Sequence, residues 1–524
     1  MTLKRFILGV LTIAILFILS LSLIASWNQP QIQSRLELYQ TNLLLHATEW
    51  QGETAQGVDF KSARETLIGV EPLKAATKQY EQARQSAQTV LQQLQQQNPL
   101  LSPAPEKPLK VTPGIETSIS RKQAPLQASI QQTEQLINEL DLRLGILQVE
   151  QGQTEAALKT WTELNERVQT QPNGESAAKT ATVLIGLWSS PPRLLPDAQQ
   201  WINKQLDGWF RYQGLKRLYQ LQQREDALSK LIAAEREIAE QAVLKLAIVS
   251  AVPTLGFLVG VGLLIFLVGQ RLVKGKDSLL AQNENLPWST PWDAETIWQV
   301  FVVGFFLMGQ ILVPLAFFLL KVKASSFDVR GQSLYVLASY VLVALGGLSV
   351  LYFSIKPFLP LPQQEKWFRL DLSGNWFWWG LGGYLTALPL VILVSLINQL
   401  VWRGQGGSNP LLPLVLGSQD GVALLIFFLT AAVAAPLFEE FLFRGFLLPS
   451  LTRYMSVWGA IGASSLLFAV AHLSLSEVLP LTTLGMVLGV VYTRSRNLLA
   501  PMLLHSLWNS GTLLSLFILG SGGK

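Results

Sequence analysis

Residues 421–448 read GVALLIFFLTAAVAAPLFEEFLFRGFLL, and this stretch decides the fold class. Helical residues rise about 1.5 Å each, so the block is long enough to cross a hydrocarbon core about 30 Å thick. It nevertheless contains two glutamates and an arginine, although a charged side chain at mid-bilayer costs about 2.5–3.5 kcal/mol on insertion scales. The stretch therefore predicts a membrane-spanning helix whose polar residues have a use.

The composition extends this interpretation to most of the chain. Of 524 residues, 49% are hydrophobic and only 14% are charged, whereas soluble domains carry about 25% charged residues. The mean hydropathy is +0.32. We therefore expect an all-α fold, that of a polytopic α-helical membrane protein. Nine apolar blocks have the length of a membrane span, and they lie near 6–25, 243–268, 297–320, 332–354, 376–400, 421–448, 455–474, 477–494 and 498–517.

Cysteine, histidine and charge usage exclude several classes of protein. The chain has no cysteine, which excludes disulfides, iron–sulfur clusters, thiolate zinc sites and a cysteine nucleophile. Its three histidines leave little material for a histidine-rich metal centre. Residues 26–242 hold 22 basic and 24 acidic residues, so the overall excess of positive charge is not pooled there. We therefore expect no nucleic-acid partner.

The distribution of basic residues predicts the orientation in the membrane. Lys4 and Arg5 precede the first apolar block. Together with the Lys and Arg of every second loop after it they make eleven basic residues on one side, against four in the other loops. This bias places the N-terminus in the cytoplasm and residues 26–242 on the outer side, periplasmic or lumenal. The membrane is expected to be a bacterial cell membrane or a thylakoid-type membrane.

Three regions follow from these blocks. Residues 1–25 form an N-terminal membrane anchor or a cleaved signal, and the length of the apolar run favours the anchor. Residues 26–242 form an extramembrane helical domain, in which a Pro-rich stretch over 99–113 is typical of a linker. Residues 243–524 form a membrane core of eight spans.

The extramembrane region contains a pattern typical of tetratricopeptide hairpins. Leu144, Gly145, Ala157 and Trp161 fall at the offsets of such a unit. Stacked hairpins offer a concave face to peptides, so a peptide or protein partner is one interpretation. A plain helical hairpin without a binding role is the other. A second, weaker copy of the pattern includes Tyr212, Leu215, Ala227 and Leu231.

Helix geometry separates the two adjacent glutamates of the block over 421–448. At about 100° per residue, Arg444 lies about 40° from Glu440 but about 140° from Glu439. Glu440 and Arg444 are therefore expected to form an ion pair. Glu439 keeps a free carboxylate, which suits a general acid or base.

Two further pairs have the same spacing of four residues. Phe468 and His472 share one helix face, and His505 and Asn509 share another. A purely structural interpretation is that these groups only join helices, since hydrogen bonds between spans contribute about 0.6 kcal/mol on average. Together with the glutamates, however, they form a dense polar group in apolar helices.

This polar group resembles the CAAX-protease and bacteriocin-processing family of intramembrane proteases, also called the Abi family, which includes the Rce1-type prenyl-protein endopeptidases. The resemblance covers residues 415–515, and the eight spans from 243 onward match the eight-helix core that the family implies. Each motif alone is weak, whereas the ordered set is specific. The motifs are Glu439-Glu440-x-x-x-Arg444, Phe468-x-x-x-His472 and His505-x-x-x-Asn509.

The resemblance implies an intramembrane endopeptidase and a role for each residue. Glu439 and His472 would activate the attacking water, and His505 and Asn509 would stabilise the oxyanion. The expected partners are membrane lipid and a membrane-associated peptide or protein substrate. The resemblance implies supporting roles for Glu440, Arg444 and Phe468.

The sequence leaves the metal and the activity open. Glu439, His472 and His505 could bind a divalent metal such as zinc, although no His-Glu-x-x-His motif is present, and a metal-independent water mechanism is the favoured interpretation. A non-catalytic transporter, scaffold or immunity factor would also explain a polar cluster. A third hypothesis makes the region over 26–242 the main functional part.

Overall fold

All regular secondary structure among the described residues is helical, which confirms the predicted fold class. The computed structural model describes residues 2–520 except 28, 30–32, 51–67, 98–114, 170, 172–173, 360–366, 403 and 419. The predicted linker over 99–113 lies outside the described residues. The chain divides into two units, one over 1–32 and 249–520 and the other over 33–248.

Eight helices of the described chain are long and apolar enough to cross a membrane, so the protein is an integral membrane protein. Many of their apolar side chains are exposed, as Leu255, Leu258 and Ile265 are, and lipid is the solvent that suits such a surface. The eight are α1 (Leu3–Trp27), α10 (Glu225–Lys274), α11 to α12 (Ala294–Leu319), α13 (Val329–Ile355), α14 (Trp376–Trp402), α16 to α18 (Gly421–Leu451), α20 (Val478–Ser495) and α21 (Leu499–Gly520).

One of the nine predicted spans, the block over 455–474, is wrong in its length. The block over 455–474 contains α19 (Val457–Val470), which has only 14 residues. At about 1.5 Å per residue it is about 21 Å long, shorter than the hydrocarbon core. The helix ends early because Leu473 adopts a positive φ of 58° and the chain turns there. His472 therefore lies in a turn just beyond the helix and not within a span.

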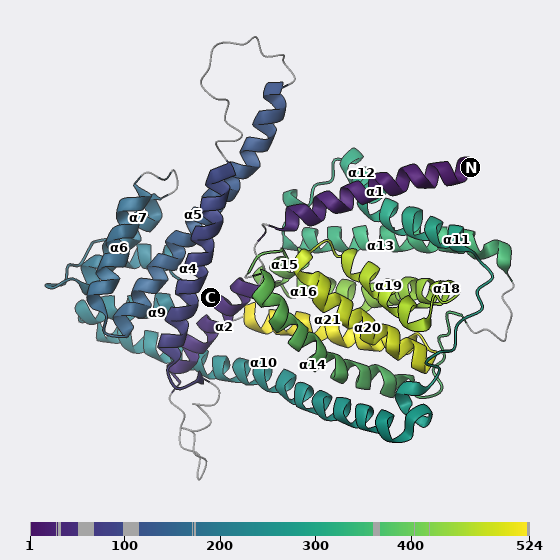
Figure 1. The fold of residues 1–524 in the computed structure, drawn as a ribbon. Coiled ribbons are helices and arrows are strands. Elements are labelled where there is room, and N and C mark those ends of the chain that lie inside the picture. Colours follow the sequence, from purple (N-terminus) through teal and green to yellow (C-terminus); the bar gives the residue numbers. More distant parts are fainter. Residues whose placement is uncertain are drawn as a thin grey trace. The chain divides into compact units, whose positions relative to one another are not determined.

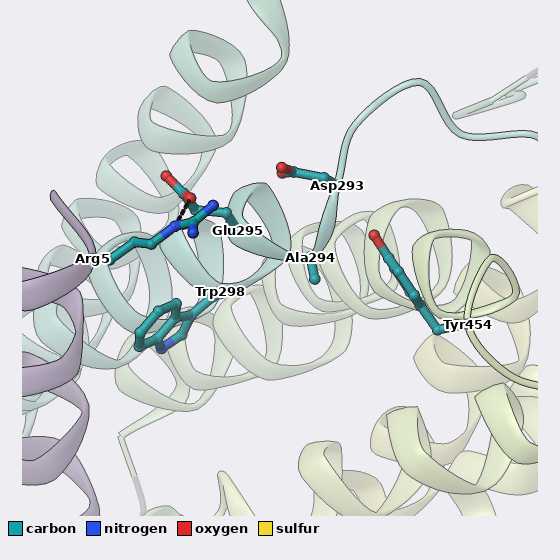
Figure 2. Close-up of a pocket in the computed structure, with 6 residues that line it drawn as sticks. All are labelled: Arg5, Asp293, Ala294, Glu295, Trp298 and Tyr454. Atoms are coloured by element: carbon teal, nitrogen blue, oxygen red, sulfur yellow. Dashed lines mark hydrogen bonds and ion pairs between the residues drawn. The ribbon is translucent and has the colours of Figure 1, made fainter. Parts of the chain in front are cut away.

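Helix α1 packs as part of the membrane unit. Its residues Leu8, Ile15 and Leu19 are buried in the same apolar core as α18 and α19. At its N-terminal end, Arg5 Nε lies 2.7 Å from Glu295 Oε2 on α11 (Ala294–Gln299), as Figure 2 shows. These contacts give the first apolar block a packing role in the membrane unit, while its role as an anchor stays a prediction.

Short side chains allow the membrane helices to approach closely. Helices α14, α20 and α21 lie side by side (Figure 1). A Cβ at Gly383 of α14 would lie 2.6 Å from both Val491 and Leu504 side-chain atoms, and one at Gly380 would lie 2.9 Å from the Ala500 carbonyl oxygen. Small residues at such crossings provide the van der Waals packing that joins helices in lipid.

Polar caps fix where three membrane helices begin. The Asp328 carboxylate accepts from the Gly331 N–H at the start of α13, and the Asp420 carboxylate accepts from the Ala423 N–H at the start of α16 (Gly421–Phe428). The Ser456 hydroxyl accepts from a backbone N–H at the start of α19. Each cap satisfies a donor that would otherwise have no partner.

The second unit has its own apolar core. Gly145 allows close contact there, since a Cβ would lie 2.2 Å from Trp161 Nε1, which donates to the Leu142 carbonyl oxygen. Two of the residues that fit the predicted tetratricopeptide pattern are thus in close contact, while a peptide-binding role stays a prediction. The helices are α2 (Gln33–Thr48), α4 (Pro72–Gln97), α5 (Ile115–Glu150), α6 (Thr154–Val168), α7 (Glu175–Trp188), α8 (Ala198–Gln205), α9 (Gly208–Leu221) and the first part of α10.

Candidate active site

The predicted ion pair between Glu440 and Arg444 is present and buried. Arg444 Nη1 donates to Glu440 Oε1 over 2.9 Å, and both residues have no exposed surface. Arg444 Nη2 donates to the Gly485 carbonyl oxygen of α20 over 3.1 Å. The guanidinium carbon also lies 4.6 Å from the centre of the Phe468 ring, a cation–π contact. The arginine therefore joins three helices.

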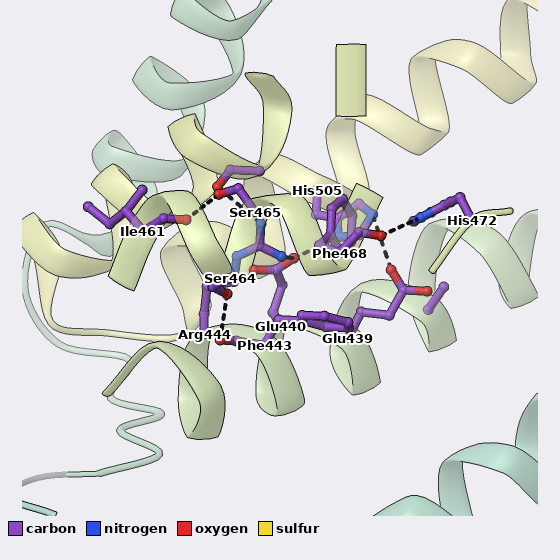
Figure 3. A network of polar contacts seen from close by, with 12 residues as sticks. Glu439, Glu440, Phe443, Arg444, Ile461, Ser464, Ser465, Phe468, His472 and His505 are labelled. Carbon is purple, nitrogen blue, oxygen red and sulfur yellow. Dashed lines mark hydrogen bonds and ion pairs between the residues drawn. The ribbon is translucent and has the colours of Figure 1, made fainter. Parts of the chain in front are cut away.

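His505 extends this pair to α21. Its Nδ1 lies 2.8 Å from Glu440 Oε1 (Figure 3). A carboxylate paired with Arg444 accepts hydrogen bonds, so Nδ1 is the ring nitrogen that carries a hydrogen and donates. His505 Nε2 is left facing the other glutamate, and it lies 4.0 Å from Glu439 Oε2. Glu440 thus sets both the orientation of the imidazole and which nitrogen faces Glu439.

Glu439 has a different environment from its neighbour. Its side chain is 16% exposed, whereas that of Glu440 is fully buried. Glu439 Oε1 accepts a hydrogen bond from the Tyr340 hydroxyl of α13 over 3.1 Å. No arginine or lysine of the described chain forms an ion pair with Glu439. The predicted Glu440–Arg444 pair is thus present, whereas the Glu439 carboxylate faces the Tyr340 hydroxyl and the His505 imidazole.

Glu439 lines a cavity of about 410 Å³ whose wall is mainly apolar and aromatic. A cavity of this size fits a large side chain or a short length of extended peptide. The ionisable side chains on the wall include a carboxylate and an imidazole, two groups that a hydrolase can use as acid or base. The lining residues from α17 (Ala435–Glu440), α13, α19 and its following turn include Glu439, Phe438, Tyr340, Phe468 and His472.

His472 lies on the cavity wall in the turn after α19. Its Nδ1 lies 2.8 Å from the Phe468 carbonyl oxygen, which can only accept, so Nδ1 carries the hydrogen. Nε2 is then the nitrogen that can accept a proton from water or bind substrate. The hydrogen bond to the Phe468 carbonyl oxygen fixes the His472 ring, although His472 lies beyond the end of the helix.

Phe468 is the common neighbour of the two imidazoles. Its ring meets that of His472 edge-on at a centroid distance of 4.9 Å, and that of His505 at 5.7 Å. Such edge-to-face contacts restrict ring orientation. The supporting role that the resemblance implied for Phe468 therefore has a physical basis, since one ring holds both histidines and Arg444.

The Asn509 side chain is engaged by the backbone of a neighbouring helical segment. Its Nδ2 donates to the Ala431 carbonyl oxygen over 2.7 Å. Ala431 belongs to η6 (Leu429–Ala434), a π-helical segment that leads into α17. The amide thus holds the helix that carries Glu439, and among the described residues it is not one of those that line the cavity.

The three candidate metal ligands do not converge on one point. Within the part of the chain that the structure describes, no group of three or more acidic or histidine side chains could hold a metal ion. Glu439 and His505 approach only to 4.0 Å between Oε2 and Nε2. Zinc needs its ligands at about 2.0–2.2 Å in a tetrahedral array. The side chains as placed do not fit that geometry.

Tyr340 is the site residue that sequence reasoning missed. It lies in the apolar block over 332–354, outside the motif region. A single tyrosine in a membrane span does not indicate a functional site, because packing of its aromatic ring is enough to explain its presence. Only the fold brings its hydroxyl to Glu439.

Comparisons with known proteins agree with this site. Residues 421–511 match the family model described as type II CAAX prenyl endopeptidase Rce1-like. A "Putative membrane peptidase YdiL" of Bacillus subtilis is 24% identical over 140 residues, which are 27% of this chain and 56% of that protein. The "Membrane-embedded CAAX protease MroQ" of Staphylococcus aureus is 23% identical over 216 residues, 40% of this chain and 83% of that protein.

A third relative is an "Uncharacterized 24.3 kDa protein" of Escherichia coli, 34% identical over 103 residues, which are 19% of this chain and 48% of that protein. No solved structure matches the chain. The chain thus spans about half the length of two of these three relatives. The matches confirm the predicted resemblance: residues 421–511, which hold the three motifs, are similar to the Rce1-like family of endopeptidases.

The buried ion pair makes a prediction about stability. Replacing Arg444 by Met leaves the Glu440 carboxylate buried without a counter-charge, which costs about 3–5 kcal/mol. We expect the detergent-solubilised Arg444→Met variant to show a clearly lower melting temperature. The double variant Glu440→Gln with Arg444→Met should regain part of the loss, because it removes the unpaired charge.

A matched control is Arg330→Met. Arg330 pairs with Asp420 over 2.6 Å, but its side chain is 57% exposed. Exposed ion pairs contribute little, so this variant should melt close to the wild type. Equal losses of melting temperature in the Arg444 and Arg330 variants would show that the buried pair has no special role.

Proposed function

We propose that this protein is an intramembrane endopeptidase that cleaves a membrane-associated peptide or protein by attack of an activated water. The observation that supports this most is the unpaired Glu439 carboxylate on the wall of an apolar cavity, with the His505 Nε2 4.0 Å away and His472 on the same wall. A carboxylate placed there without a lysine or arginine partner is costly for structure alone. It suits a base that acts on a substrate entering from the bilayer.

In this mechanism Glu439 and His472 activate the water. Glu439 accepts a proton from the water as its oxygen attacks the scissile carbonyl carbon, and His472 Nε2 hydrogen-bonds the same water. The proton on Glu439 is then passed to the leaving amine. The aromatic wall excludes bulk water, so these transfers occur in surroundings of low dielectric.

The negative charge on the carbonyl oxygen is stabilised by His505. Because Nδ1–H donates to Glu440, only Nε2 can face the reacting atoms, and in the doubly protonated imidazole Nε2–H donates to the oxyanion. Asn509 was expected to share this role, and it can do so if its amide leaves the Ala431 carbonyl. Glu440 and Arg444 act as positioning residues, since Glu440 contacts His505 directly and Arg444 acts on it through its ion pair with Glu440.

We further propose that no metal is needed. The chemistry is supplied by one carboxylate and two imidazoles, whose hydrogen bonds fix their orientation. No step is assigned to a divalent ion, because no three acidic or histidine side chains of the described chain lie close enough together to hold one.

The Glu439→Gln variant tests the proposed function. Glutamine keeps the shape and the hydrogen bond from Tyr340 but cannot accept a proton from water. We expect cleavage of internally quenched apolar peptides in proteoliposomes to fall about 10²–10⁴-fold, the usual contribution of a general base. The melting temperature should stay near that of the wild type, because Glu439 is unpaired.

The control is Glu284→Gln, which removes a carboxylate that pairs with Arg271 in a loop of the same unit. Its cleavage rate should match the wild type. Full activity of Glu439→Gln would contradict the proposal. A polar cluster kept only for structure or transport predicts that result, together with a lower melting temperature.

The orientation is also a proposal: the N-terminus is cytoplasmic and residues 26–242 lie on the opposite side of the membrane. The absence of native cysteine allows a direct test with single-cysteine variants. Lys159→Cys in α6, where the lysine side chain is 78% exposed, should react with a membrane-impermeant maleimide in intact cells. Lys276→Cys, in the loop after α10, should react only after permeabilisation.

The wild-type chain lacks a thiol and is the unreactive control. The opposite pattern, with Lys276→Cys labelled in intact cells and Lys159→Cys protected, would reverse the orientation. Labelling of both positions in intact cells would mean that α10 does not cross the membrane.

A further inference from the structure

Tyr340 brings a hydroxyl group to the candidate active site from outside the Rce1-like segment. It lies on α13, and its hydroxyl is 3.1 Å from Glu439 Oε1 and 3.4 Å from the Ala435 carbonyl oxygen. The residue also lines the cavity. The hydroxyl is therefore in contact with the proposed general base and with the space that the substrate would occupy.

The packing of α13 holds the Tyr340 ring in this position. The ring meets Phe438 edge-on at a centroid distance of 6.0 Å. Two turns further along α13, a Cβ at Gly347 would lie 2.9 Å from the Gly304 carbonyl oxygen and 3.1 Å from the Phe438 ring. The absence of a side chain there lets α13 approach Phe438, so the tyrosine is placed by the fold and not by a flexible loop.

Two other donors of this region, Ser339 and Asn509, are engaged elsewhere. The Ser339 hydroxyl, on the same wall, donates to the Tyr335 carbonyl oxygen over 2.7 Å. The Asn509 amide donates to the Ala431 carbonyl oxygen over 2.7 Å. The Tyr340 hydroxyl differs from both, because its acceptor is a carboxylate whose charge changes during the proposed reaction.

We propose that Tyr340 is a second oxyanion donor in the cleavage reaction, an inference that rests on the proposed function. In the resting site its O–H donates to the Glu439 carboxylate. When Glu439 takes a proton from the attacking water, the carboxyl group becomes neutral and a weaker acceptor. At the same moment the carbon–oxygen bond forms, the carbonyl π electrons move onto the substrate oxygen, and that oxygen becomes the strongest acceptor nearby.

The hydroxyl then turns from Glu439 to the oxyanion, and its proton stays on Tyr340 throughout. When the tetrahedral intermediate collapses, the carbonyl forms again and the amine leaves with the proton that Glu439 returns. The hydrogen bond goes back to Glu439 once its carboxylate is regenerated. The donor is thus satisfied in both states, which limits the cost of burying it.

The test is Tyr340→Phe in the full-length protein in proteoliposomes, with the best-cleaved peptide of the quenched library as the substrate. The variant keeps the ring and its contact with Phe438 but loses the hydroxyl. We expect kcat to fall about 10²–10³-fold, as for removal of one oxyanion donor, with KM within about twofold of the wild type. A phosphinic analogue of the tetrahedral intermediate should lose affinity by a similar factor.

The control is Tyr352→Phe, since Tyr352 lies on the same helix with 51% exposure and does not line the cavity. An unchanged kcat in Tyr340→Phe, or a change in KM alone, would overturn the role of Tyr340 while Glu439→Gln still loses activity. Failure of the wild-type protein to cleave any peptide overturns the proposed function itself. Should Tyr340→Phe not fold, a fluorinated tyrosine at position 340 must alter kcat, and an unaltered kcat would overturn the role.

Discussion

The buried contact between Glu440 and Arg444 is the interaction on which the rest of the site depends. Two opposite charges are held in the membrane unit without exposed surface, and the arginine also meets a carbonyl of α20 and the ring of Phe468. Because a carboxylate paired in this way remains an acceptor, it can fix the Nδ1–H of His505. One ion pair thus connects α17, α19, α20 and α21 and orients a proposed catalytic group.

This pair also explains why adjacent glutamates have different environments. Successive residues of a helix point about 100° apart, so the helix that turns Glu440 inward turns Glu439 toward the cavity. The inner carboxylate is neutralised by an arginine, and the outer one meets a tyrosine and an imidazole. A single Glu-Glu sequence therefore supplies a structural group and a reactive group side by side.

Much of this arrangement could be predicted from the sequence. Apolar length predicted the helical membrane fold, and the four-residue spacing predicted the Glu440–Arg444 pair, because both signals are local. The predicted length of the span over 455–474 was wrong because composition does not show where a helix ends. The end is visible only in the backbone, which turns at Leu473.

Longer-range relations could not be predicted. The bond from His505 to Glu440 joins residues 65 apart, and that from Tyr340 to Glu439 joins residues 99 apart. The sequence around His505 or Tyr340 does not indicate these bonds, since a histidine or tyrosine in an apolar helix can serve packing alone. The contact of Asn509 with Ala431 likewise depends on how α21 meets a π-helical segment. Such contacts arise from the packing of helices, which spacing within one helix does not determine.

The hydrogen positions on the imidazole rings test the central claim most directly. With only three histidines in the chain, nitrogen NMR of the isotope-labelled protein can resolve each ring. The account predicts that His505 carries a hydrogen on Nδ1, and that this signal changes in Glu440→Gln while the signals of His46 do not. A His505 ring protonated on Nε2 alone would contradict the account, because Glu440 would then not orient the imidazole toward Glu439.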